Sequence, residues 1–172
     1  MPATQRQIDL ARLSLSSGQA QSLDVEVPLE PVSFGDQQYR PAERTEAKLD
    51  ISRPTTGYAL RLRFSGELAG PCTRCLEPAQ LAVAVDAREV DQPTTDDEEL
   101  RSPYVSDDTL DLARWANDSF VLALPNKLLC RSDCAGLCSV CGESLNDADP
   151  EAHKHDTGGD PRMAKLRGLK LD

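Results

Sequence analysis

The chain has 172 residues, of which 39% are hydrophobic, and it carries a net charge of -10 at pH 7. This length allows one domain with a small appendage. The charge has the wrong sign for a protein that binds a phosphate backbone with its whole surface, because such binding depends on Lys and Arg displacing counterions. It is compatible with an acidic body that holds a basic partner or binds RNA through a local patch.

Cysteine usage indicates the compartment. The N-terminal stretch has no continuous apolar segment of the kind that a secretory signal needs, and no stretch approaches the roughly 18 apolar residues of a membrane span. Six cysteines without an export signal indicate a reducing compartment, where thiols stay free or bind metal. We therefore expect a cytoplasmic protein with no membrane association.

Alternation of hydrophobic and polar residues, which is typical of half-buried strands, recurs along the first half of the chain. Residues 1–20 are polar with scattered leucines, and residues 31–44 are predicted to be a connection. The turn-forming residues 54–57 join two alternating stretches, which form the best predicted hairpin. The predicted strands are residues 23–29, 45–53, 58–64 and 80–90.

One main helix is predicted after an acidic, exposed loop at residues 91–107. It is expected to begin from Asp108, with Asp108 or Thr109 as the N-cap, and to end before Pro125. Trp115 and Phe120 lie on its apolar face. We expect both to be core residues, because basic residues that would accompany base stacking do not interleave with them.

These elements predict an α+β fold with an antiparallel, barrel-like sheet, one main helix, a cysteine-rich zinc-binding segment and a short C-terminal helix. The short helix is indicated by Asp160-Pro161, an N-cap followed by proline in the first helical position. The predicted division is an N-terminal arm at residues 1–20, an α+β core at residues 21–128, and a Cys/His metal-binding segment with the C-terminal helix at residues 129–172.

The soft ligands of the chain are six cysteines and two histidines, and all of them occur in closely spaced pairs. Zinc prefers four N or S ligands in a tetrahedron, and two ligands from one tight turn supply half of it. A Cys-x2-Cys pair in a connection between strands has the form of a metal knuckle. In chain order, the pairs are Cys72 and Cys75, Cys130 and Cys134, Cys138 and Cys141, and His153 and His155.

Eight ligands suffice for two tetrahedral sites, so the sequence predicts one or two structural zinc ions. The preferred arrangement joins the first pair to the second, which ties the sheet to the end of the helix, and the third pair to the histidines. The alternative is one four-cysteine site that joins the first pair to the third. The histidines also have a second interpretation, as solvated residues of a polar tail.

The pattern does not indicate catalysis. A catalytic zinc keeps three protein ligands and an open position, whereas ligands are in excess here. A redox role would place Cys72 and Cys75 at the start of a helix inside a βαβ unit, but predicted strands flank the pair. The sequence therefore predicts a non-enzymatic protein without a small-molecule substrate. The alternatives are a thiol oxidoreductase or metal-dependent RNA hydrolase that uses the cysteine clusters, and a zinc-ribbon adaptor for transcription.

Several motifs resemble the YceD family, in the family's order, over roughly residues 60 to 170. The family is named for the accumulation of large-subunit ribosomal RNA. The resemblance implies a non-enzymatic factor in large ribosomal subunit biogenesis. The motifs are Phe64-x-Gly66, Cys72-Thr73-Arg74-Cys75-Leu76, Asp111-Leu112, Leu122-Ala123-Leu124-Pro125, the segment from Cys134 to Gly142, Leu145-Asn146 and Asp160-Pro161-Arg162.

The resemblance also bears on the ligand pairing. Some family members carry histidines where Cys130 and Cys134 stand here and lack the third cysteine pair, which implies that the first and second pairs share one metal. Other members carry Cys-x-Cys near the position of His153 and His155, and this replacement keeps metal-ligand chemistry.

The expected partner is a large-subunit precursor or a basic ribosomal protein, and the charge of the chain suggests the acidic residues 96–99 as one contact. Direct contact with ribosomal RNA is the alternative, and it would use basic residues near the first knuckle or at the C-terminus. The C-terminal group could equally line the polar side of a docked helix. The candidate partner-binding residues are Arg61, Arg63, Arg74, Arg162, Lys165, Arg167 and Lys170.

Overall fold

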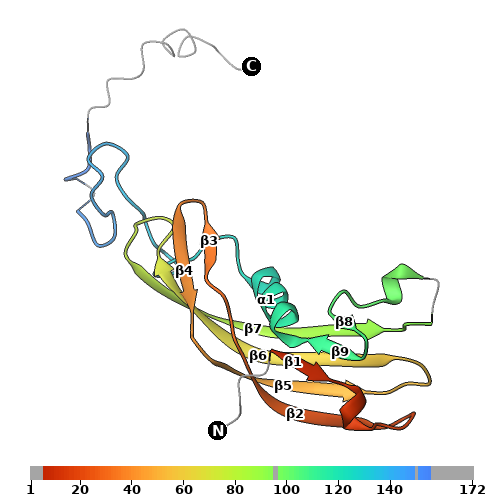
Figure 1. Ribbon diagram of the computed structural model, residues 1–172. Coiled ribbons are helices and arrows are strands. Elements are labelled where there is room, and N and C mark those ends of the chain that lie inside the picture. Colours follow the sequence, from red (N-terminus) through yellow and green to blue (C-terminus); the bar gives the residue numbers. More distant parts are fainter. Residues whose placement is uncertain (1–5, 95–96, 150, 156–172) are drawn as a thin grey trace, which may run out of the picture.

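The computed structural model describes residues 6–94, 97–149 and 151–155. Within them, the main antiparallel sheet has six strands, with β2-β5-β6-β4-β3 in order and β7 paired to β6 (Figure 1). A smaller sheet has the order β1-β9-β8. The strands are β1 (Gln7–Asp9), β2 (Ala20–Val27), β3 (Val32–Phe34), β4 (Gln37–Pro41), β5 (Thr45–Ser52), β6 (Tyr58–Pro71), β7 (Pro78–Asp91), β8 (Val105–Ser106) and β9 (Thr109–Asp111). The helices are α1 (Leu112–Ala123) and the 3-10 turns η1 (Ala11–Leu13) and η2 (Glu98–Leu100).

The main sheet is built around β6. This strand pairs with β7 along its whole length, from Tyr58 opposite Asp91 to Pro71 opposite Pro78. Its other edge is shared, because β5 pairs with its first half and β4 pairs near Leu68. From Tyr58 to Leu68, every second residue of β6 is buried on the same face of the sheet. The buried side chains are Tyr58, Leu60, Leu62, Phe64 and Leu68.

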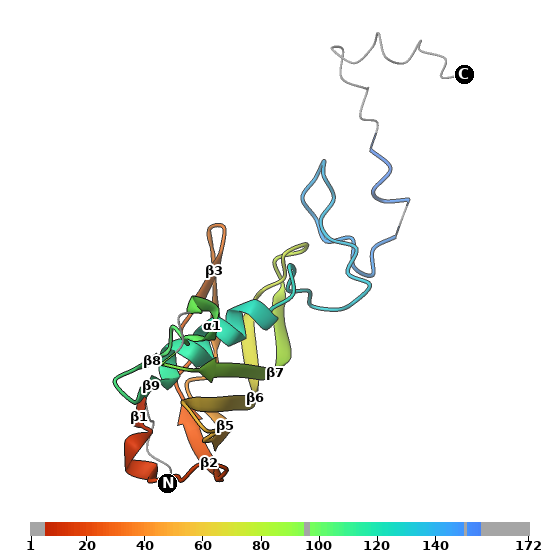
Figure 2. The same cartoon turned by 90° about the vertical axis from the view of Figure 1, so that its right-hand side faces the viewer.

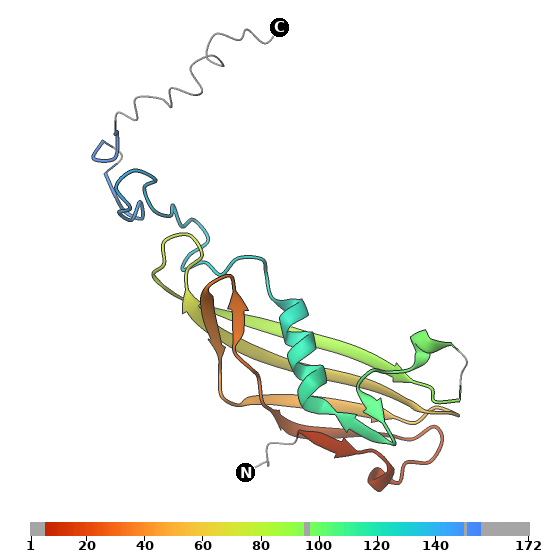
Figure 3. The same ribbon diagram turned by 45° about the horizontal axis from the view of Figure 1, so that its top comes forward.

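That buried face is covered by α1 and by the small sheet (Figures 2 and 3). Trp115 and Phe120 of α1 are 1% and 0% exposed, which confirms both as core residues. Phe120 packs closely on β6 because Gly66 has no side chain, and a Cβ at Gly66 would lie 2.6 Å from the Phe120 ring. The Asn117 side chain accepts a hydrogen bond from the Glu30 N–H at 2.7 Å, which ties α1 to the segment after β2.

The structure confirms the α+β class and the four predicted strands, but it differs from the prediction at residues 31–44. This segment forms the β3–β4 hairpin rather than a connection. Gly35 takes a φ of +58° at the turn, and Tyr39 is buried and packs edge-on against Phe34 with ring centroids 5.2 Å apart. The strands are short and interrupted by turn residues, so their alternation is too brief to recognise.

The helix begins later than predicted. Thr109–Asp111 pairs with β1 as β9, and Asp107 and Asp108 have positive φ. The N-cap is Asp111, whose side chain accepts a hydrogen bond from the Arg114 N–H at 3.1 Å. The helix ends as predicted, because Leu124, which precedes Pro125, is extended.

The expected barrel-like closure is not found in the described residues. The main sheet is open, because β2 pairs only with β5 and β7 pairs only with β6. α1 and the small sheet cover its inner face, so closure of the sheet is not needed to bury that face. The predicted C-terminal helix lies outside the described residues. No helix in the part of the chain that the structure describes is long and apolar enough to cross a membrane.

Candidate metal centre

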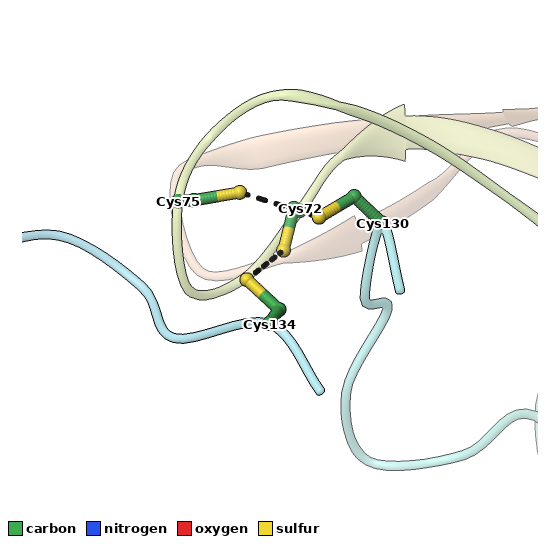
Figure 4. Close-up of side chains that lie close together, drawn as sticks. All are labelled: Cys72, Cys75, Cys130 and Cys134. Atoms are coloured by element: carbon green, nitrogen blue, oxygen red, sulfur yellow. Dashed lines mark hydrogen bonds between the residues drawn. The ribbon is translucent and has the colours of Figure 1, made fainter. Parts of the chain in front are cut away.

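Four cysteine side chains meet where the β6–β7 hairpin turns, and we call them the four-cysteine cluster: Cys72, Cys75, Cys130 and Cys134 (Figure 4). Their sulfur atoms lie within 4.8 Å of one another. The Sγ atoms of Cys72 and Cys134 are 3.8 Å apart, and those of Cys75 and Cys130 are 3.5 Å apart. Neighbouring sulfurs in a tetrahedral site with Zn–S bonds of about 2.3 Å are about 3.8 Å apart. The cluster is therefore positioned to bind a metal ion.

The turn between β6 and β7 presents the first two sulfurs. The Cys72 N–H donates to the Glu77 carbonyl at 2.7 Å, and the Leu76 N–H donates to the Cys72 carbonyl at 3.0 Å. These bonds close a tight turn that brings both thiols to one side. Leu76 occupies a left-handed conformation with φ +63°, where a glycine would be unstrained. Its side chain is 59% exposed.

The other two sulfurs come from the segment that follows α1. Thr73 fixes this segment to the turn, because both its N–H (2.8 Å) and its hydroxyl (3.2 Å) donate to the Leu128 carbonyl. The Asn146 side chain accepts a hydrogen bond from the Ala135 N–H at 2.9 Å, and its amide nitrogen lies 3.6 Å from the Cys134 sulfur. Neither Thr73 nor Asn146 was predicted as a site residue. The only sequence signal for them is their place in the family motifs.

The electrostatics of the cluster favour a cation at its centre. Burial alone would raise the pKa of Cys72, but backbone N–H groups, led by that of Arg74, outweigh burial and lower it to about 6. Burial and the neighbouring thiols, Cys75 first, raise the pKa of Cys130 to about 12. Because one thiolate makes ionisation of the next unfavourable, full ionisation of the cluster requires a bound positive charge.

A second group of ligands, the distal cluster, consists of Cys138, Cys141, His153 and His155. Their ligand atoms also lie within 4.8 Å of one another. The Cys141 Sγ is 3.5 Å from the His153 Nδ1, close to the roughly 3.6 Å edge of a tetrahedral site with Zn–S of about 2.3 Å and Zn–N of about 2.0–2.1 Å. His155 Nε2 is buried and has no hydrogen-bond partner among the described residues. This donor set is also positioned to bind a metal ion.

The distal knuckle repeats the hydrogen bonds of the first one. The Cys138 N–H donates to the Glu143 carbonyl at 2.8 Å, and the Gly142 N–H donates to the Cys138 carbonyl at 2.9 Å. Gly142, at φ +75°, occupies the place that Leu76 has in the first knuckle. Backbone N–H groups of Cys141 and Val140 lower the pKa of Cys138 to about 6. Both knuckles therefore direct backbone N–H groups at their first sulfur.

The two groups correspond to the preferred pairing, in which the first cysteine pair meets the second and the third meets the histidines. The alternative site, which joins Cys72 and Cys75 to the third pair, is not the arrangement in the structure. The spacing predicted which ligands are neighbours, because each tight turn supplies two, and the family resemblance favoured this combination of pairs over the alternative.

The arginines proposed to bind a partner are less available than expected. Arg61 forms two hydrogen bonds with Asp86, of 2.7 and 2.6 Å, and Arg63 forms one of 2.6 Å with Asp50. Arg74 is exposed at the tip of the β6–β7 turn. The C-terminal candidates Arg162, Lys165, Arg167 and Lys170 lie outside the described residues, as does part of the acidic segment 96–99.

A family model described as "Large ribosomal RNA subunit accumulation protein YceD" matches residues 60–170. The chain belongs to the YceD family. The match confirms the resemblance noted from the sequence. The YceD region includes most of β6, all of β7 and α1, and both ligand clusters.

Curated relatives occur in mycobacteria, and their names describe them as uncharacterized proteins. Those of Mycobacterium bovis and Mycobacterium tuberculosis are 36% identical over 132 residues, which is 70% of this chain and 61% of the relative. A Mycobacterium leprae protein is 36% identical over 105 residues, which is 57% of this chain and 46% of the relative. The matches thus span 61% or less of the relatives' own length. No solved structure matches the chain significantly.

Proposed function

We propose that this protein is a non-enzymatic factor that supports accumulation of large-subunit ribosomal RNA by binding a component of the large-subunit precursor. The observation that carries the proposal is the family match over residues 60–170. The family's name refers to accumulation of large-subunit ribosomal RNA, and the match includes the two ligand clusters.

Zinc is the proposed metal, with a structural role in both clusters. Thiolate and imidazole ligands suit zinc, and sets of four cysteines, or of two cysteines with two histidines, are typical of structural sites. A catalytic zinc would need an open position for water or substrate, whereas each cluster supplies four protein ligands. The four-cysteine cluster would hold the segment after α1 on the β6–β7 turn.

A basic protein is the partner that the charge distribution favours. The chain carries a net charge of -10, and Arg61 and Arg63 are engaged by Asp86 and Asp50. A carboxylate partner reduces the ability of an arginine to neutralise phosphate. We therefore favour a basic ribosomal protein over ribosomal RNA as the direct contact, and the cytoplasm, where such particles are assembled, as the place of action.

The metal assignment is tested by mass spectrometry of natively purified protein. We expect two zinc ions per chain, falling to one when His153 and His155 are both changed to Ala. Thiols should become reactive only when a chelator strips the metal. Absence of metal from the native protein, with two freely reactive thiols, would instead favour the oxidoreductase alternative.

The cellular role is tested in a bacterial strain depleted of the protein. We expect the ratio of large-subunit to small-subunit ribosomal RNA to fall and to recover when the wild-type chain is supplied. A variant with Cys130 and Cys134 both changed to Ser should restore the ratio poorly. An unchanged ratio after depletion would refute the proposed function.

A further inference from the structure

β7 has an unpartnered edge next to α1. Among the described residues, β7 pairs only with β6, so the backbone groups along its other edge are not part of a ladder. Natural edge strands are commonly protected by charged residues, prolines or bulges. The stretch from Ala79 to Val85 contains no charged residue and no proline, whereas the stretch from Ala84 to Glu89 contains Asp86, Arg88 and Glu89. Because no described residue pairs with this edge, it is available for pairing with another extended chain.

A groove follows this edge. It has a volume of about 470 Å³, and we call it the edge groove. One wall is β7 itself, and the other is formed by Tyr104 and the second half of α1. Tyr104 stacks on Trp115 with ring centroids 6.3 Å apart, and its hydroxyl donates to Asp118 at 3.1 Å. The lining residues are Ala84, Val85, Asp86, Ala87, Arg88, Glu89, Tyr104, Trp115, Ser119, Leu122 and Ala123.

The helix wall presents an apolar side chain that the fold itself does not need. Leu122 is 85% exposed, although it lines the groove. A leucine in this position contributes little to the core, but it would be buried by a chain lying in the groove. The combination of a free strand edge and an apolar helix wall matches the way in which an extended peptide adds a strand to a sheet.

The charge of the chain favours a basic occupant. Among the lining residues, Asp86 is already paired with Arg61, and Arg88 and Glu89 carry opposite charges, but the whole chain carries a net charge of -10. Burial raises the pKa of Glu89, and the Ser102 hydroxyl opposes this shift, so a nearby cation would stabilise the ionised form. A second copy of this chain would bring a further net charge of -10 against the same acidic chain.

We propose that the edge groove binds an extended segment of a basic protein partner, which pairs with the edge of β7, places apolar side chains against Leu122 and directs Lys or Arg toward Glu89. Only a polypeptide can continue the backbone ladder, so a protein fits the edge better than a nucleic acid. This inference rests on the proposed function and specifies the chemistry of the partner.

The test uses the full chain with its metal and a synthetic ten-residue peptide of alternating Val and Lys. We expect the peptide to perturb backbone NMR signals of residues 84–89 and of the second half of α1. A peptide with the same side chains but N-methylated backbone amides should bind at least about tenfold more weakly, because it cannot pair with the strand edge.

Leu122→Glu should weaken binding of the peptide by about tenfold or more. The thermal midpoint of the protein should stay unchanged, because the Leu122 side chain is exposed. The matched control is Val121→Glu, a neighbouring residue that is 48% exposed and does not line the groove. Peptide signals that map elsewhere, or equal effects of the two variants, would overturn the inference. The inference would also be overturned if oligouridylate, and not the peptide, perturbed the NMR signals of the groove. A dimer of the wild-type chain that Leu122→Glu converts to a monomer would overturn it as well.

The two variants are also supplied to the depleted strain. A fall in large-subunit RNA with Leu122→Glu, but not with Val121→Glu, supports both the groove and the proposed function. If depletion itself leaves the RNA ratio unchanged, the proposed function fails, and the peptide mapping still decides whether the groove is a binding site. If both variants restore the RNA ratio fully, the groove is not the site used in that role.

Discussion

Metal removal from the four-cysteine cluster is expected to release residues 129–155 while the sheet and α1 stay folded. Among the described residues of this segment, only Cys134, Gly136 and Cys138 are buried. Such limited burial cannot offset the entropy of ordering the segment. The core under α1, by contrast, includes fully buried side chains such as Trp115 and Phe120, which do not depend on the ligand segment for their burial against the sheet.

The size of the effect follows from binding linkage. A metal that binds only the docked segment, at a free concentration 1,000 times its Kd, stabilises docking by about 4 kcal/mol, or about a thousandfold. Just before the segment, the two hydrogen bonds from Thr73 to the Leu128 carbonyl, worth about 1 kcal/mol each, should stay in place. Hydrogen exchange at the Cys134 and Leu145 amides should therefore accelerate by roughly a thousandfold when a chelator removes the metal.

Amide exchange measured by NMR on the same sample separates local release from unfolding. Amides in the middle of the β6–β7 ladder should keep their protection, and Cys134→Ser should reproduce the chelator's effect. Cys141→Ser is the matched control, because it removes a ligand of the distal cluster and leaves the Cys134 amide protected. Protection at Cys134 that survives complete metal removal would refute the reasoning, since protein contacts alone would then suffice to dock the segment.

Four further changes have defined outcomes. Phe120→Ala should lower the free energy of unfolding, measured with urea, by about 3–5 kcal/mol, because the ring is fully buried. Gly66→Ala should lower the same free energy by about 1–3 kcal/mol, because its Cβ would lie 2.6 Å from that ring. In Gly142→Ala the new Cβ meets no atom within 4 Å, but the φ of +75° at this position strains an alanine by roughly 1–2 kcal/mol. This strain should weaken metal binding at the distal cluster several-fold, as measured by competition with a chelator. Burial raises the pKa of Glu89 in the folded protein, so the ionised side chain lowers the stability of the fold at pH values above that pKa. This loss of stability disappears as the pH falls through the folded-state pKa and the side chain becomes protonated. Glu89→Gln should therefore raise the thermal midpoint at pH 7 and not at pH 4.

The sequence predicted the structure well where a single local pattern, such as alternation along a strand or ligand spacing in a turn, determines the outcome. Alternation along residues 58–64 predicted β6 because one face of that strand is buried throughout. The knuckle spacing predicted which ligands are neighbours, since each tight turn places two sulfurs side by side, but it left open which pairs share a site. The helix start was wrong because Asp108 is a good N-cap residue, but pairing of Thr109–Asp111 with β1 overrides that local preference.

The edge groove could not be recognised from the sequence. Its walls come from β7 and α1, whose lining residues are up to 39 positions apart, between Ala84 and Ala123. Leu122 fits the helical apolar pattern only poorly, and the sequence does not reveal that the edge of β7 runs beside it. The ion pairs of Arg61 and Arg63 with neighbouring strands also depend on strand register, which alternation alone does not define.

The four-cysteine cluster and the groove lie at different places along the β6–β7 hairpin, so their roles can be separated. The cluster includes Cys75 at the turn, whereas the groove begins at Ala84, about 20 Å beyond the start of β7 at Pro78 at roughly 3.3 Å per residue. Between them, β7 is paired with β6 without a break. Loss of metal should therefore leave peptide binding in the groove unchanged. If the chelated protein loses peptide affinity in step with protection at Cys134, the released segment must contribute to the groove, and the two sites would have to be treated as one.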